Sequence, residues 1–231
     1  RGGQHIRVMA SHLAWNGRLV WQIVRTSLGG VGQMLVAMTS WIFLMRILAS
    51  IGSEAVAGAT IAIRIMMFTM MPAWGMSNAA ATLVGQNLGA GHPERAEKSV
   101  WRAAFLNMIF LGLVTVAFLL LARPMIALFT DDAEVLRHGI LCLQIVSLGY
   151  VFYAYGMVVS QSFNGAGDTR TPTLINLVGF WMFQIPLAYF LALQLGVGTP
   201  GVYAAISIAE SAIAIAGIII FRQGKWKTVR I

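Results

Sequence analysis

The sequence predicts an all-α membrane protein, a bundle of six transmembrane helices. Hydrophobic residues make up 58% of the 231-residue chain and charged residues only 10%, whereas soluble globular chains average roughly 45–50% and about 25%. So few charges cannot cover a water-exposed surface of normal size. The apolar residues also stand in runs long enough to cross the hydrocarbon core, which takes about 20 residues of helix.

Six apolar intervals of the required length follow one another along the chain. Charged residues separate most of them; residues 103–122, for example, carry none between Arg102 and Arg123. The apolar interval after Arg170 is too long for one span, and a cluster of glycine and proline around Pro200 divides it, because such clusters are typical of turns. The predicted spans are residues 26–48, 57–82, 99–122, 139–163, 172–195 and 201–221.

The distribution of lysine and arginine predicts the orientation. If both termini lie on one side, the opposite side carries only Arg46, Arg123 and Arg137. The first side then carries Arg1, Arg7, Arg18, Arg25, Arg95, Lys98, Arg102, Arg170, Arg222, Lys225, Lys227 and Arg230. Because basic loops remain in the cytoplasm, we expect both termini to be cytoplasmic. The protein is expected to be a multi-pass component of the plasma membrane, the inner membrane of a prokaryote.

The chain divides into three predicted parts. These are a cytoplasmic amphipathic connector at residues 1–25, a six-span transmembrane lobe at 26–222 and a basic cytoplasmic tail at 223–231. In the connector, apolar residues recur at helical spacing among basic ones, which is typical of a helix lying on lipid headgroups. A partly ordered connector fits the same residues. The chain begins with Arg1 rather than methionine, so we expect a fragment of a longer protein.

Composition also argues against several kinds of partner. The net charge of +8 does not indicate nucleic acid, because the basic residues lie between apolar runs and at the two ends; the expected partner is the lipid bilayer. The single cysteine, Cys142, excludes an internal disulfide and is expected to be a small core residue. The four histidines have no ligand spacing, so we expect no metal site and no cofactor.

Two predicted cytoplasmic loops share a pattern. The first, residues 85–96, has the sequence GQNLGAGHPERA, and the second, residues 163–172, has the sequence FNGAGDTRTP. In each, glycine follows a helix, where it can adopt the left-handed C-cap conformation, and proline begins the next helix. We expect Thr171 to cap the helix that Pro172 begins. Two well-made turns explain this pattern, and so does an internally repeated bundle.

These loops resemble the cytoplasmic loops of the multidrug and toxic compound extrusion (MATE) transporter family. The resemblance is carried by QNLGAG and PERA in the first loop and by GAGDTRTP in the second. Shorter matching phrases are GSEAVA at 52–57, IAIRI at 61–65 and LFTDD at 128–132. Together they cover nearly the whole chain in the right order and resemble the C-terminal six-helix lobe of that family.

The resemblance implies a fold and a function. The family is built as twelve helices in two lobes, and its members are secondary antiporters that export organic, often cationic and amphipathic compounds. The resemblance therefore implies multidrug efflux, Na⁺ or H⁺ as the coupling ion, small amphipathic or cationic substrates, and the N-terminal lobe of the same transporter as partner. No enzymatic activity is expected.

Two ionisable residues within predicted spans are candidates for the substrate or ion pathway, because a charge at the bilayer centre costs about 3 kcal/mol. Glu210 lies near the middle of the last span, either as a cation or proton site or as a buried hydrogen-bonded acid. Arg64 lies in the second span, where the resemblance also places an arginine. We expect Arg64 to anchor the outer end of its helix or to pair with a carboxylate.

The resemblance also implies that this lobe lacks the two acids that form a cation site in members of the family. Members of the family carry a carboxylate in the first span, beside a glutamine, and another acid in the fourth span. Aligned on Gln33, this chain has Gly32 at the first position, and residues 139–163 contain no acid. The resemblance therefore implies a coupling acid in the N-terminal half.

Uncharged polar and aromatic side chains within the spans are candidates for a cavity lining or for hydrogen bonds between packed helices. They are Gln33, Asn78, Gln144, Tyr150, Tyr153, Tyr155, Gln161, Asn176 and Gln184. The predicted pathway consists of Glu210, Gln33, Arg64, Tyr153, Gln161 and Gln184. We expect Pro72 and Pro186 to kink their helices, because proline lacks a backbone N–H. Clustered methionines in the second span offer an adaptable lining or a flexible core.

Three alternatives remain open at the sequence level. A flippase for lipid-linked precursors would need a larger basic cavity than these spans offer. A membrane enzyme would need paired acids, a Ser/His set or metal ligands within the spans, whereas the acid pair Asp131 and Asp132 lies in a predicted outer loop. A six-span remnant without transport activity would need only the packed helices.

Overall fold

The computed structural model describes residues 17–228, so residues 1–16 of the predicted connector and 229–231 of the predicted tail lie outside the described part of the chain. The described residues form helices and no strand, which confirms the all-α class. The helices are α1 Gly17–Ile51, α2 Ser53–Gly89, α3 Pro93–Ala127, α4 Ala133–Ser147, α5 Tyr150–Gly165, α6 Arg170–Asn176, η2 Leu177–Gln184, α7 Ile185–Tyr189, η3 Phe190–Gln194, α8 Thr199–Arg222 and η4 Lys225–Thr228.

The described residues contain up to six candidate membrane spans, the number that the sequence predicts. Five of them are helical stretches that are long and apolar enough to cross a membrane alone: Ser27–Ile51, Ser53–Gly89, Pro93–Ala127, Arg170–Gln194 and Thr199–Arg222. The sixth consists of α4 and α5 together, which meet at a bend of 59°.

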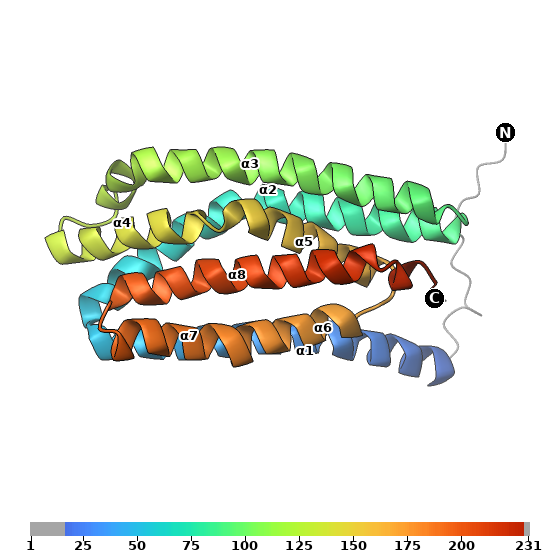
Figure 1. The fold of residues 1–231 in the computed structure, drawn as a ribbon, viewed down its shortest axis with the longest axis horizontal. Coiled ribbons are helices and arrows are strands. Elements are labelled where there is room, and N and C mark those ends of the chain that lie inside the picture. Colours follow the sequence, from blue (N-terminus) through green and yellow to red (C-terminus); the bar gives the residue numbers. More distant parts are fainter. Residues whose placement is uncertain (1–16, 229–231) are drawn as a thin grey trace, which may run out of the picture.

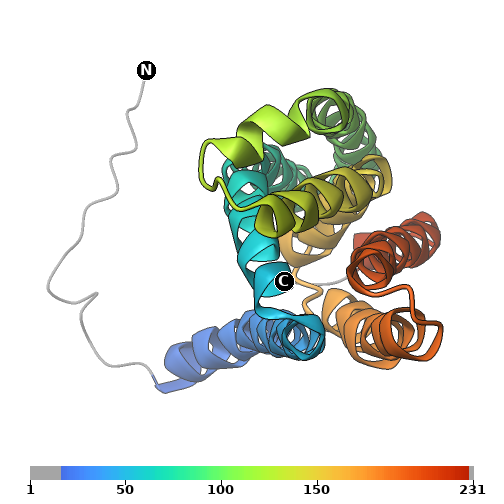
Figure 2. The same cartoon turned by 90° about the vertical axis from the view of Figure 1, so that its left-hand side faces the viewer.

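The helices lie side by side in one bundle (Figure 1). The start of α1, the α2–α3 and α5–α6 turns and the end of α8 lie at one end, which we name the basic end because Arg95, Arg170 and Arg222 lie there. The connections α1–α2, α3–α4 and η3–α8 lie at the opposite end, so successive spans alternate in direction. Seen from that opposite end, α1 lies at the edge of the bundle beside the α6–η3 segment (Figure 2).

The prediction of one continuous helix over 139–163 is wrong. The helix breaks at Leu148 and Gly149, where the N–H of Gly149 bonds the carbonyl of Val146 three residues back and the normal helical ladder stops. Glycine suits this position for a second reason. A Cβ on Gly149 would lie 3.1 Å from the Cα of Ser207, so α8 approaches α5 at a distance that a side chain would prevent.

At the break, carbonyl groups lose their normal helical N–H donors. Side chains of neighbouring helices donate hydrogen bonds to these carbonyl groups instead. Ser207 Oγ donates to the carbonyl of Ile145 at 2.6 Å, and Thr115 Oγ1 donates to that of Ser147 at 2.9 Å. Because lipid supplies no donors, irregular backbone inside a membrane persists only where protein satisfies it in this way. The break is therefore stabilised by α3 and α8.

We expect Thr115→Val to destabilise the lobe by about 1–3 kcal/mol, because the shape is kept while the carbonyl of Ser147 loses its donor. The measurement is thermal unfolding of the purified protein in detergent. Thr82→Val is the matched control, since the exposed Thr82 hydroxyl donates only to Asn78 in its own helix. Equal shifts for the two variants would contradict a role for Thr115 at the break.

The fifth span changes its hydrogen-bonding pattern around Pro186. Two π-helical segments, η2 and η3, lie on either side of the short α7, and Pro186 lies in the first turn of α7. Proline has no N–H to donate, and a π-helical segment is one way in which a helix accommodates that loss. Pro72 lies inside the continuous helix α2, so the kink expected there stays a prediction.

The ends of the chain extend the bundle at the basic end. Helix α1 begins at Gly17, so residues 17–25 of the predicted connector are helical and continuous with the first span. After α8, the side chain of Trp226 stacks on Phe221 with ring centroids 4.5 Å apart. Lys227 Nζ lies 2.5 Å from Glu97 Oε2. The start of the predicted tail is therefore packed against α3 and α8.

The α5–α6 turn is built differently from the prediction. Gly167 has a φ of +80°, which explains a glycine at this position. The helix begins at Arg170, and the carboxylate of Asp168 accepts hydrogen bonds from the N–H of Thr171 at 3.1 Å and from its Oγ1 at 2.5 Å. The prediction of Thr171 as the capping residue is therefore wrong, because Thr169 occupies the N-cap position. The carboxylate of Asp168, one residue earlier, accepts from the N–H of Thr171 in the first turn and so serves as the side-chain cap.

We expect Asp168→Ala to cost about 1 kcal/mol of stability, the usual effect of losing a cap. Asp168→Asn should cost less, because an amide oxygen still accepts from the N–H of Thr171. Thermal unfolding of the two variants in the same detergent gives the comparison, and a larger loss for the asparagine variant would exclude capping as the role of this side chain.

Candidate functional site

A cavity of about 660 Å³ lies between α1, α2, α5 and α8, beside the break in the fourth span. Its walls are mainly apolar, aromatic and thioether side chains. They come from Met34, Ala37, Met38, Trp41, Ile42, Ile63, Met66, Met67, Met70, Trp74, Val146, Gly149, Tyr150, Tyr153, Ile206, Ser207 and Glu210. Such a lining suits an amphipathic ligand with an aromatic or alkyl body.

Glu210 is the one acid in the cavity wall, and it is partly buried there. No described residue forms an ion pair or a hydrogen bond with its carboxyl group, so a structural hydrogen-bonded acid would have no donor within the described lobe. The ionisable side chains that face it from α5 are Tyr150 and Tyr153. α1 and α2 contribute no charged side chain to this wall. The carboxylate is therefore exposed to whatever enters the cavity.

Tyr153 lies in the same wall as Glu210, so the structure brings these two predicted residues together. Trp74 lines the same cavity as Tyr153. Aromatic faces at this position can hold a cation by cation–π attraction, worth about 0.5–2 kcal/mol.

Two other predicted residues meet at the basic end instead. Gln33 Nε2 donates to Asn164 Oδ1 at 3.1 Å and to the carbonyl of Thr169 at 3.2 Å. Asn164 Nδ2 in turn donates to Gln161 Oε1 at 3.1 Å. This network ties α1 to the α5–α6 turn, and neither glutamine lines the cavity.

Gln184 and Arg64 lie apart from both groups. Gln184 is buried and accepts a hydrogen bond from Ser40 at 3.2 Å, which joins the fifth span to α1. Arg64 is exposed, and within the described residues it has no ion pair with a carboxylate. Of the other polar candidates, Gln144 donates to the carbonyl of Leu119 at 3.1 Å and so serves helix packing.

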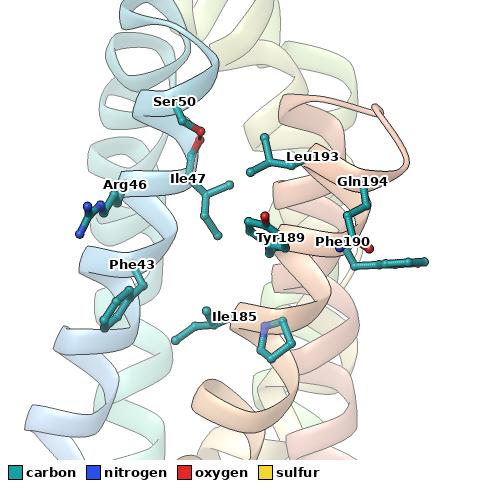
Figure 3. A pocket seen from close by; sticks show the side chains of 10 residues that line it. Phe43, Arg46, Ile47, Ser50, Ile185, Tyr189, Phe190, Leu193 and Gln194 are labelled. Carbon is teal, nitrogen blue, oxygen red and sulfur yellow. Dashed lines mark hydrogen bonds between the residues drawn. The ribbon is translucent and has the colours of Figure 1, made fainter.

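A second groove lies between α1 and the α7–η3 segment near the opposite end of the bundle (Figure 3). Its volume is about 710 Å³, and Ile47 and Leu193 face each other across it. The groove contains no acid, and its one charged side chain, Arg46, points away from the gap (Figure 3). A cationic ligand finds no counter-charge there, so the cavity with Glu210 is the better candidate site.

The sequence profile of the MatE family matches residues 30–190. These residues include α2–α5 and most of α1, and therefore most of the cavity wall. The chain belongs to the MatE family.

Two relatives of this MatE chain are described as probable multidrug resistance proteins. It is 26% identical over 206 residues to a probable multidrug resistance protein NorM of Thermotoga maritima, covering 89% of this chain and 44% of that protein. It is 27% identical over 178 residues to a probable multidrug resistance protein NorM of Brucella suis, covering 75% of this chain and 38% of that protein.

Solved structures of MATE and MOP superfamily transporters share the fold of this chain. The MATE transporter ClbM in complex with Rb⁺ superposes with a TM-score of 0.82 at 25% identity, over 90% of this chain and 50% of that one. A MOP superfamily transporter from Pyrococcus furiosus superposes with a TM-score of 0.87 at 22% identity, which shows a shared fold. The MatE chain spans about half the length of the relatives it matches.

Several cavity residues of the MatE lobe could not be predicted from the sequence. Trp41 and Trp74 come from long apolar helices, in which nothing distinguishes a cavity-facing tryptophan from one that faces lipid. Ser207 lies one helical turn before Glu210, and that spacing was the available signal. The break at Gly149 was hidden because apolar residues continue on both sides of it.

Proposed function

We propose that this chain is one lobe of a secondary active transporter that exports amphipathic organic cations in exchange for Na⁺ or H⁺. The observation that carries the proposal is the cavity in which Glu210, without an ion-pair partner in the described lobe, faces aromatic and thioether side chains. An organic cation buries its apolar body against such walls and its charge beside the carboxylate.

Exchange follows from sharing one carboxylate between two cations. A substrate and a coupling ion that both need the charge of Glu210 exclude each other, so the binding of one favours the release of the other. The resemblance implies a coupling acid in the N-terminal half, and Glu210 is an acid that this lobe itself supplies. ClbM was solved with Rb⁺ bound, which supports a small monovalent cation as the coupling ion.

The remainder of the proposed transporter is a second lobe. An alternating-access path forms between two lobes that rock against one another, and this chain spans about half the length of its relatives. We propose that the basic end faces the cytoplasm, in keeping with the excess of lysine and arginine there.

The proposal is tested by export of a fluorescent organic cation from cells that produce the intact transporter. We expect lower accumulation of the dye than in cells without the transporter, and we expect the difference to vanish when an ionophore dissipates the H⁺ and Na⁺ gradients. Unchanged accumulation in cells that contain the transporter in their membrane would contradict the proposal.

A further inference from the structure

The first and fifth spans are joined in the middle of the bundle and border a groove beyond that point. Trp181 Nε1 donates to the carbonyl of Val36 at 3.2 Å, and the rings of Phe43 and Trp181 meet with their centroids 5.5 Å apart. The groove of about 710 Å³ begins there and runs between α1 and the α7–η3 segment toward the end opposite the basic end (Figure 3). On α1 it extends over residues 43–50, about 10 Å of helix. That is about two thirds of one hydrocarbon leaflet, which is roughly 15 Å thick.

The groove and the cavity with Glu210 lie on opposite sides of α1. Met34 and Trp41 line the cavity, whereas Phe43 and Ser50 line the groove. Phe43 follows Met34 by nine residues, and Ser50 follows Trp41 by the same number. Nine residues are about two and a half helical turns, so the members of each pair point in opposite directions. The proposed second lobe, closing over the cavity, therefore leaves the groove facing the surrounding lipid.

The side chains that border the groove do not fill it. Ile47 and Leu193 face each other across the gap (Figure 3). Tyr189, Phe190 and Leu193 remain 50%, 46% and 41% exposed. Inside a membrane, association depends on close van der Waals contact, because lipid tails are as apolar as the side chains themselves. A hydrocarbon chain lying parallel to the two helices supplies the contacts that these side chains lack.

The charge at the groove suits the headgroup of a lipid. Arg46 is the one charged side chain in its wall, and the guanidinium group lies outside the gap (Figure 3). Arg46 is exposed and forms no ion pair within residues 17–228. It lies five residues before α1 ends at Ile51, which is close enough for its long side chain to reach the depth of the headgroups. A guanidinium group pairs readily with a phosphate.

An apolar gap with a positive charge at its rim matches an anionic amphiphile. A ligand that is ionic throughout would need the charge inside the gap, and a cationic amphiphile would need an acid, which the groove does not contain. A phospholipid with a net negative headgroup meets both conditions, since its chains are hydrocarbon and its phosphate stays at the membrane surface.

We propose that the groove binds one anionic phospholipid from the leaflet at this end of the bundle. One acyl chain lies between α1 and the α7–η3 segment, and the phosphate pairs with Arg46. The lipid thereby connects the first and fifth spans beyond the contact of Phe43 with Trp181. The inference requires that the chain lies in a membrane, and it depends neither on Glu210 nor on the coupling ion.

The test is native mass spectrometry of the intact transporter in detergent, titrated with phosphatidylglycerol and, separately, with zwitterionic phosphatidylcholine. We expect the first phosphatidylglycerol to bind more tightly than the first phosphatidylcholine. Arg46→Gln should weaken this binding about fivefold, the contribution of one basic side chain beside anionic lipid. Arg123→Gln is the matched control and should bind as the original protein does, because Arg123 is exposed at the same end of the bundle but lies outside the groove.

A second variant tests the position of the acyl chain. Leu193→Trp places a larger side chain in the groove and should abolish the tight binding of the first phosphatidylglycerol while Arg46 is kept. Leu113→Trp, at a position of α3 that is 66% exposed, should have no effect. Equal losses for Arg46→Gln and Arg123→Gln, equal affinities for the two lipids, or tight binding by a folded Leu193→Trp variant would each overturn the proposal. If Leu193→Trp does not fold, the two arginine variants still decide.

Discussion

Glu210→Gln should remove ion-coupled export while the protein remains folded. The glutamine keeps the size of the side chain but can neither release a proton nor pair with a cation. We expect the rate of gradient-driven dye export to fall at least about tenfold, a change of about 1.4 kcal/mol in the barrier. The measurement is the initial rate of dye export from liposomes that contain the intact transporter.

Thermal stability provides the check that this variant is folded. An acid at mid-membrane costs about 3 kcal/mol when charged, so its neutral substitute should unfold at the same temperature as the original protein or above it. Glu94→Gln is the matched control, because Glu94 is exposed in the first turn of α3. Equal export by both variants and by the unchanged protein would remove Glu210 from the mechanism.

Gly165→Ala should have the largest effect on folding among single small changes in the lobe. A Cβ at Gly165 would overlap the carbonyl oxygen of Ala81 and lie 2.8 Å from the Cα of Ala81. The clash involves the backbone of α2, which cannot rotate away as a side chain can. We expect the free energy of unfolding to fall by about 3 kcal/mol, the upper end of the range for overpacking a core. The measurement is thermal unfolding in detergent.

Gly112→Ala is the control for this substitution. No atom lies within 4 Å of a Cβ at Gly112 in the middle of α3, so the added methyl group meets open space. There the change should be neutral or should stabilise the helix by up to about 1 kcal/mol. Similar losses for both variants would show that close packing at Gly165 is not the cause.

The close approach of Gly165 to Ala81 gives a second reason for the glycines of a motif that the sequence alone explains only as a turn. Gly165 and Gly167 both belong to GAGDTRTP, but they serve different ends. Gly165 allows α5 to approach α2, whereas Gly167 adopts a positive φ in the turn itself. Local turn chemistry predicts the second requirement and not the first, because the approach of α2 depends on residues about 80 positions away.

The helical bundle could be predicted because a chain that crosses lipid must satisfy its backbone hydrogen bonds internally, which long apolar helices do. Long charge-free intervals and one glycine–proline cluster were sufficient for the number of spans, and the alternation of ends in the structure agrees with that number. The break in the fourth span could not be predicted in this way. Its carbonyl groups are satisfied by Thr115 and Ser207, which belong to helices far along the chain.

The candidate site was predictable only in part. Glu210 stood out because an acid within an apolar span is costly, and Tyr153 is its neighbour in the cavity. Gln33, Gln161 and Gln184 were chosen for polarity alone. The structure places Gln33 and Gln184 in hydrogen bonds between separate segments, and Gln161 in a hydrogen bond with Asn164 of its own helix. Polarity does not distinguish a cavity-facing amide from a packing amide.

Proton release on substrate binding tests most directly whether Glu210 is shared between proton and substrate. An organic cation is added to the intact transporter in weakly buffered detergent solution near neutral pH, and the pH change is recorded. We expect the protein to release up to about one proton for each cation bound, because the two compete for one carboxylate, and we expect Glu210→Gln to bind without release. The same release from both proteins would contradict the account.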